Sequence, residues 1–135
     1  EPLPPNLNLH GYISSDEYLK VLARADVAIS SLALHRIQLE EASTLKSREC
    51  LALGLPLVVA YTDTDLDDAG FDFLLKIPNK EDNIQTHGEV IREFAYRMRG
   101  VRADRAALKD RIDAARKEEL RLKFFEEFTD LKSGR

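Results

Sequence analysis

The sequence predicts an α/β fold in which helices cover a parallel β-sheet. Two apolar runs, 26–31 and 55–60, have the composition of short strands that are buried on both faces. A helical pattern separates them, and a third strand-like run follows at 72–77. Strands that alternate with helices along a chain are typical of parallel α/β layer structures.

The first helix is expected directly after Ser14. Glu17 stands three residues later, and this spacing forms a capping box, in which each side chain bonds the backbone of the other residue. The helix should end near Arg24, just before the strand at 26–31. Residues 1–5 contain three prolines and should lie extended.

The second helix is expected at 44–53. Ser43 is a good N-cap, Gly54 is suited to the turn after the helix, and Pro56 stops its continuation. The loop before this helix leaves the carboxyl end of the strand at 26–31. Ligands bind at that edge of parallel sheets, so the loop and the helix start are candidate site elements.

The remainder of the chain continues the same alternation. An acidic loop is expected at 61–71, a strand at 72–77 and a helix at 87–99 that Gly100 ends. A final helix is expected at 103–131, with apolar residues at helical spacing. We interpret residues 1–135 as one domain with 101–135 as its C-terminal helical segment. The apolar positions of the last helix are Leu108, Ile112, Ala115, Leu122 and Phe125.

Two glutamates eight residues apart give the segment its chemistry. Glu41 lies in the loop and Glu49 on the helix, between Leu45 and Leu53 at i−4 and i+4. A carboxylate on an apolar stripe needs a partner, and vicinal ribose hydroxyls are suitable donors. Alternatively, Glu49 pairs with Lys46 and Glu41 is solvated. The spacing alone leaves both interpretations open.

The start of the same helix is suited to an anion. The free N–H groups of Thr44, Leu45 and Lys46 would form a phosphate site. These amides would bind phosphate, Glu49 would bind ribose, and Glu41 would bind a further ring. This combination of groups indicates a sugar nucleotide as the ligand.

Residues 41–59 resemble a motif of family 4 glycosyltransferases with the GT-B fold. The matching features are Glu41-x7-Glu49 and the G-L-P-L-V-V run at 54–59. Residues 8–13 resemble the family's strand and turn before this region, and residues 18–31 resemble its next helix and strand. The resemblance implies a Rossmann-like, three-layer parallel sheet that forms part of a GT-B C-terminal, donor-binding domain.

The resemblance also implies a function, namely a retaining glycosyltransferase for a nucleotide-sugar, as in polysaccharide or glycoconjugate synthesis. Glu49 would bind ribose, and Glu41 would be the catalytic residue that contacts the donor sugar. The turn at Gly11, Tyr12 and Ile13 would hold the base. In such enzymes no metal or other cofactor is required. Ser43, Thr44, Leu45 and Lys46 would complete the donor site.

Several features depart from the common family pattern. Many members have E-G-F-G where this chain has E-A-S-T, and the loop at 31–40 is longer than usual. His35 and Arg36 in this loop could touch a phosphate or an acceptor, although a surface role is favoured. The chain starts at what would be the third strand of the donor domain. We therefore expect a piece of a larger enzyme, inactive alone, whose acceptor domain and diphosphate-binding Arg and Lys lie upstream.

Two other functions fit the same residues. A sugar-nucleotide epimerase of the same fold would need further acid/base residues, and a non-catalytic nucleotide-sugar-binding or scaffold module would need none. Asp63-Thr64-Asp65 matches a D-x-D metal motif of other glycosyltransferases, but a solvated acidic loop is favoured, so no metal is expected.

Composition limits the partners and the compartment. The net charge of −4 argues against nucleic acid. The single Cys50 excludes an internal disulfide and fits a reducing compartment such as the cytoplasm. No apolar run reaches the roughly 18 residues of a membrane span, so membrane contact would be peripheral, through the missing domain. Two copies of the chain could pair through uncovered surfaces, including the face that contains Phe124 and Phe128.

Overall fold

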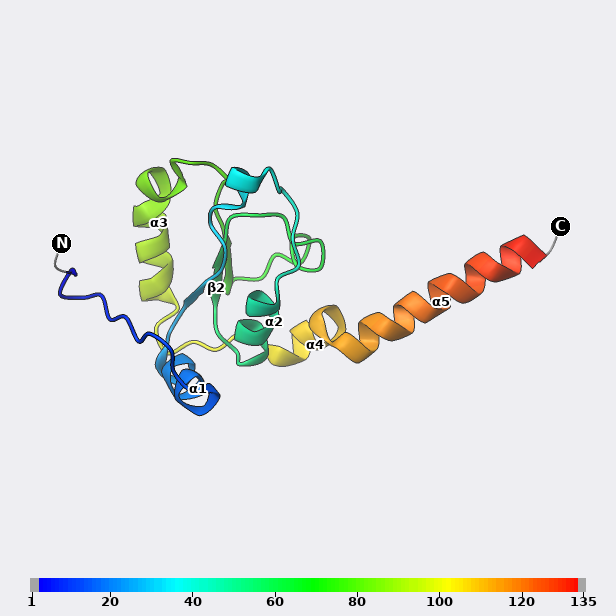
Figure 1. Cartoon of the computed structure of the whole chain (residues 1–135), viewed down its shortest axis with the longest axis horizontal. Coiled ribbons are helices and arrows are strands. Elements are labelled where there is room, and N and C mark those ends of the chain that lie inside the picture. The colour runs from blue at the N-terminus through cyan, green and yellow to red at the C-terminus, as the bar shows by residue number, and fades with distance from the viewer. Residues whose placement is uncertain (1–2, 134–135) are drawn as a thin grey trace.

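The computed structural model describes residues 3–133, with side chains described for residues 3–129 (Figure 1). Three short strands, β1 (Ala28–Ile29), β2 (Leu57–Val59) and β3 (Leu74–Lys76), form a parallel sheet in the order β1-β2-β3. Each strand lies in the middle of its predicted run. The α/β class and the parallel sheet are therefore confirmed.

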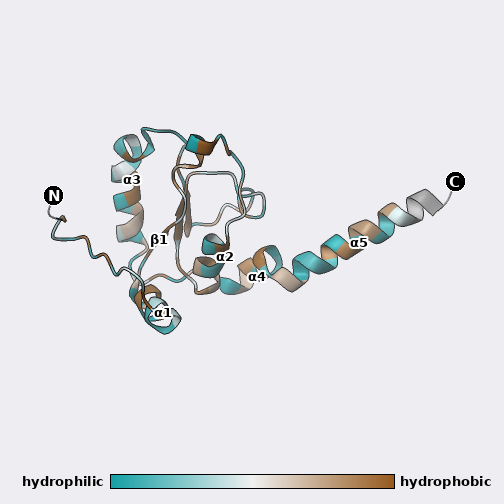
Figure 2. Cartoon of the chain, in the orientation of Figure 1, coloured by the Kyte–Doolittle hydropathy of each residue, from teal (hydrophilic) through white to brown (hydrophobic). Residues whose placement is uncertain are grey.

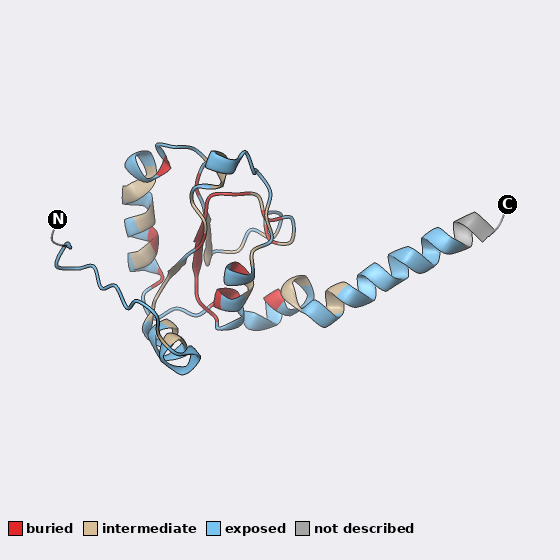
Figure 3. Ribbon diagram, in the orientation of Figure 1, coloured by how far each residue is buried: buried red, intermediate tan, exposed pale blue. Residues whose placement is uncertain are grey.

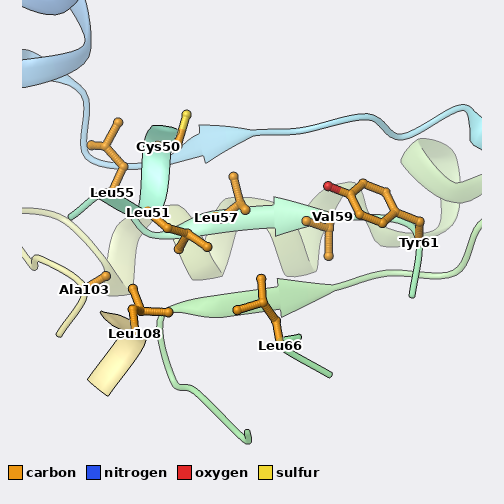
Figure 4. Packing of buried hydrophobic residues seen from close by; sticks show 9 residues of the cluster. All are labelled: Cys50, Leu51, Leu55, Leu57, Val59, Tyr61, Leu66, Ala103 and Leu108. Atoms are coloured by element: carbon orange, nitrogen blue, oxygen red, sulfur yellow. The ribbon is translucent and has the colours of Figure 1, made fainter. Parts of the chain in front are cut away.

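Helices lie on both faces of this sheet. On β2, Leu57 and Val59 pack with Cys50 and Leu51 of α2 (Leu45–Ala52), as Figure 4 shows. Val58 points to the opposite face, where it packs with Phe94 and Met98 at the end of α3 (Asn83–Arg97). This alternation follows from the two-residue period of a strand and produces three layers.

The central strand is buried along its whole length (Figure 3). Residues 55–60 are all buried, which confirms a strand covered on both faces. The same prediction is wrong for β1, where Ile29 is 51% exposed. Among the described residues β1 has a neighbouring strand on one side only, so it is an edge of the sheet.

The capping box at the start of α1 (Ser15–Arg24) is confirmed. The Glu17 amide donates to Ser14 Oγ at 3.3 Å, and the Ser14 amide donates to Glu17 Oε2 at 3.0 Å. The backbone and hydroxyl bonds from Ser14 lower the pKa of the Glu17 carboxyl. The segment before this helix differs from the family pattern, since residues 8–13 form no strand and Leu9 is 70% exposed.

Two predicted helix boundaries in the second half of the chain are wrong. α3 begins at Asn83, four residues earlier than expected, and the Asn83 side chain is buried and donates to the Leu32 carbonyl at 2.7 Å. The long C-terminal helix is divided into α4 (Arg105–Ile112) and α5 (Ala114–Ser133). Asp113 has an extended backbone, and its Oδ1 accepts from the Arg116 amide at 2.9 Å.

The two C-terminal helices have different surroundings. Leu108 of α4 is 1% exposed and joins the core beneath α2. α5 extends away from the body, and residues 118–129 are all exposed (Figures 1 and 3). Leu122 and Phe125, two apolar positions of the predicted helical pattern, are therefore exposed.

Apolar and polar residues alternate along α5 without a long apolar stretch (Figure 2). Within the described part of the chain, no helix combines the length and the apolar character needed to cross a bilayer.

Candidate functional site

The start of α2 lies at the carboxyl end of the sheet, as the sequence predicts, but its cap is Thr44 rather than Ser43. The Thr44 hydroxyl accepts from the Ser47 amide at 3.3 Å. Ser43 Oγ instead accepts from the Arg48 guanidinium at 2.7 Å. The N-cap prediction for Ser43 is wrong because both residues can cap, and tertiary contacts decide between them.

A buried cluster of four hydroxyls fixes this helix start. Thr44 and Ser47 share hydrogen bonds with Tyr61, which follows β2, and with Ser30, which follows β1. Ser30 and Ser47 are 5% and 0% exposed, and their hydroxyls are 2.9 Å apart. Because each hydroxyl has a partner, the cluster attaches the helix start to the ends of two strands without an unsatisfied polar group.

The amides of the first turn remain available. Among the described residues, the N–H groups of Leu45 and Lys46 donate to no other group, and Thr44 satisfies only the amide of Ser47. The predicted anion-binding amides are therefore reduced from three helical residues to Leu45 and Lys46, with Thr44 as the cap.

Glu41 lies beside the extension of β2. It forms an isolated parallel bridge with Thr62, and the neighbouring Ala42 amide donates to the Thr62 carbonyl at 3.0 Å. The Glu41 side chain is exposed. The loop therefore has a fixed backbone at Glu41, at the carboxyl end of the sheet, where the sequence places it.

Glu49 is exposed on α2 and has a partner that the sequence did not indicate. Its Oε2 accepts from the Tyr18 hydroxyl of α1 at 2.9 Å. No ion pair joins Glu49 to Lys46 among the described residues. Its helix neighbours Leu45 and Leu53 are 88% and 42% exposed, so the expected buried apolar stripe is absent. Partial burial and the Glu49 carboxylate raise the pKa of Tyr18 to about 12.

Glu49 lies in the wall of a groove of about 1200 Å³, between α2 and α4. Leu45 and Lys46 of α2 also line it, as does Tyr18. The opposite wall is α4, which contributes Arg105 and Lys109. Tyr18, Arg105 and Lys109 were not among the predicted site residues. The i, i+4 spacing of the two basic residues is visible in the sequence, but nothing local indicates which helix they face.

Arg48 belongs to a charged network with the loop at 61–71, which we call the acidic-loop network. Arg48 donates to Asp63 at 2.7 and 2.8 Å, and to Asp65 at 2.6 Å. Lys117 of α5 also binds Asp65. Asp63 is 1% exposed, so the prediction of a solvated loop is wrong at this residue.

The ion pairs of this network shift the pKa values of Asp65 and Arg48. Partial burial acts to raise the pKa of Asp65, but Lys117 and Arg48 outweigh it and hold that pKa below its ordinary value. Burial likewise acts to lower the pKa of Arg48, and Asp63 with Asp65 raises it overall. Both D-x-D carboxylates are therefore occupied by cations of the chain itself. Among the described residues, no three metal-ligating side chains gather at one point.

Other predicted site residues lie outside the groove lining. Gly11 has a positive φ of 64°, which fits a turn, and Tyr12 is fully exposed, but neither they nor Ile13 line the groove. Glu41 and Ser43 are also not among the lining residues. Arg36 and His35 both bind Glu81, and these bonds lower the pKa of Glu81 to about 2. Arg36 is exposed, which supports a surface role, whereas the His35 side chain is largely buried.

Comparison with known proteins gave no match to a protein-family model, to a curated protein or to a solved structure.

Proposed function

We propose that this chain is the donor-binding part of a retaining glycosyltransferase that uses a nucleotide-activated sugar. The single observation that carries the proposal is the environment of Glu49. Its carboxylate is exposed at the groove, and its hydrogen-bond donor among the described residues is a neutral hydroxyl, that of Tyr18, at 2.9 Å. A ribose hydroxyl is a donor of the same chemistry and can replace the tyrosine.

The neighbouring groups suit the rest of a donor. The unbonded amides of Leu45 and Lys46 offer hydrogen bonds to phosphate oxygens, and the start of a helix favours negative charge. Glu41 is held at the carboxyl end of the sheet, beside Thr62, where it would contact the donor sugar. The sequence resemblance assigns the same order of roles to these residues.

The protein would act by positioning and by charge stabilisation. Glu49 orients the nucleoside, and the helix amides stabilise charge on the phosphate as it leaves. The acceptor hydroxyl then attacks the sugar carbon from the face that the phosphate leaves, so the configuration is retained. The new carbon–oxygen bond replaces the bond to the phosphate, and the departing phosphate takes the hydroxyl proton. In this scheme neither glutamate forms a covalent intermediate.

The test is nucleotide affinity in Glu49 variants of this chain, measured by calorimetry with ADP, GDP, UDP, CDP and dTDP. Glu49→Ala removes a charge-assisted contact worth about 1.5–3 kcal/mol, so affinity for the preferred nucleotide should fall roughly tenfold or more. Glu49→Gln should have a smaller effect. Glu93→Gln is the matched control, since Glu93 is an exposed carboxylate on α3. Equal affinity in wild type and both Glu49 variants would exclude the ribose role.

A further inference from the structure

Three cations that line the groove have no carboxylate partner among the described residues. They are Lys46 of α2 and Arg105 and Lys109 of α4. By contrast, Arg48, which also lines the groove, is paired with Asp63, and Arg111, farther along α4, is paired with Asp68. Unpaired positive charges gathered on opposite walls of one groove are suited to a ligand with several negative charges.

The helix that carries two of these cations is firmly placed. Leu108, between Arg105 and Lys109 in the sequence, is 1% exposed and belongs to the core. Asp104 caps the helix, accepting from the Ala106 and Ala107 amides at 2.9 and 3.2 Å. The Ala103 amide donates to the Gly54 carbonyl at 2.8 Å, so the start of α4 is attached to the end of α2. Arg105 and Lys109 are one helical turn apart and line the same wall.

The two carboxylates in the groove are already engaged. Glu49 accepts from Tyr18, and Asp113 Oδ1 accepts from the Arg116 amide at the start of α5. Neither forms an ion pair with the three cations. The groove lining therefore keeps an excess of positive charge.

We propose that Lys46, Arg105 and Lys109 form a diphosphate-binding site, with two of its cations supplied by α4. This inference rests on the proposed function, because it assigns the diphosphate of the nucleotide-sugar to the groove next to Glu49. It also assigns a role to the C-terminal helical segment, which the sequence did not connect with the donor.

The experiment measures the affinity of the full chain for inorganic pyrophosphate by calorimetry. Arg105→Gln/Lys109→Gln should weaken it roughly tenfold, since charge-assisted bonds to phosphate are lost, and Lys46→Gln should weaken it by a smaller factor. The matched control is Lys20→Gln/Arg24→Gln on α1, which removes two exposed cations with the same i, i+4 spacing. The control should change the affinity less than about twofold, because charges outside the groove act on the ligand only through screened, long-range electrostatics.

Three outcomes would overturn the proposal: wild type that fails to bind pyrophosphate, equal losses in the two double variants, or an unchanged affinity in Arg105→Gln/Lys109→Gln. Thermal unfolding verifies that each variant is folded. A lipid phosphate could supply the same chemistry, so phosphatidylglycerol vesicles are titrated in parallel. Reduced vesicle binding with unchanged pyrophosphate affinity would contradict a diphosphate site.

Glu49→Gln separates this proposal from the proposed function. It should weaken nucleoside diphosphate binding without weakening pyrophosphate binding, because it removes the ribose acceptor and also takes a negative charge away from the groove. If Glu49→Gln has no effect on nucleotides while Arg105→Gln/Lys109→Gln still weakens pyrophosphate binding, the ribose role fails and the phosphate site stands. The reverse pattern would leave the ribose role intact and remove the α4 site.

Discussion

Two groups of charges at α2 are arranged in opposite ways. In the first group, Arg48 is enclosed by Asp63 and Asp65, and every one of these charges has a partner in the chain. In the second group, Lys46, Arg105 and Lys109 line a groove without a carboxylate partner among the described residues. Charges that satisfy each other hold the fold together, whereas charges left open to a groove are available to a ligand.

The largest expected effect is the loss of stability when the buried Arg48–Asp63 pair is broken. Arg48→Met leaves Asp63, which is 1% exposed, without its cation, and loss of one partner of a buried pair costs about 3–5 kcal/mol. Denaturant unfolding monitored by circular dichroism measures the change. Arg92→Met is the control, because Arg92 and Glu89 form an exposed pair worth about 1 kcal/mol or less. Similar losses in the two variants would show that the acidic-loop network is not structural.

The C-terminal helix gives a second, smaller effect, on association. Phe124 and Phe125 of α5 are 62% and 55% exposed, and β1 is an edge strand, so two copies of the chain should associate at micromolar concentration. Phe124→Gln/Phe125→Gln should lower the average mass in light scattering. Lys123→Gln is the control, because Lys123 is exposed and lies on the side of α5 opposite to the two phenylalanines. A wild-type mass that stays monomeric across concentrations would refute the association.

The acidic-loop network also predicts a pH dependence. Because Lys117 and Arg48 hold the pKa of Asp65 below its unfolded value, Asp65 stabilises the fold above that unfolded value, near 3.8. This contribution is lost as pH falls through the lower folded pKa. Asp65→Asn should therefore reduce stability at pH 7 and flatten its decline below pH 4, measured as urea midpoints. An unchanged slope would show that another carboxylate governs acid unfolding.

The smallest expected effect is a change in the pKa of Tyr18, whose hydroxyl donates to Glu49 at the groove. The Glu49 carboxylate contributes to the raised pKa of Tyr18, about 12, so Glu49→Gln should move that pKa toward 10. Carbon NMR of labelled tyrosine rings follows the titration, with exposed Tyr12 as an internal reference. Tyr18→Phe should leave Glu49 without its donor and thereby favour a ribose hydroxyl, which raises nucleotide affinity slightly. A Tyr18 pKa that is the same in Glu49→Gln would mean that burial alone raises it.

The sequence predicted what depends on local chemistry. The Ser14–Glu17 capping box, the parallel sheet and the place of Glu41 at its carboxyl end were predictable, because caps and apolar runs act over a few residues. The choice of Thr44 over Ser43 as the cap was not. It depends on Arg48, which occupies Ser43, and on the hydroxyl cluster with Ser30 and Tyr61.

Long-range pairing explains the other differences. Asp63 looks like a solvated loop residue until Arg48, fifteen positions away, is placed beside it. The partner of Glu49 is Tyr18, 31 positions away, and no local pattern indicates this contact. The division at Asp113 had a local signal, since aspartate is a good N-cap, but the continuous apolar periodicity obscured it.

Mapping a bound nucleotide by amide NMR tests the central claim most directly. A nucleoside diphosphate titrated into the labelled chain should shift the amides of Leu45, Lys46 and Glu49 on α2 and of Arg105 and Lys109 on α4. The amides of Asp63 and Asp65 should move little, because their charges are already satisfied within the chain. Shifts confined to the acidic loop, or no shifts with any of the five common bases, would contradict the account.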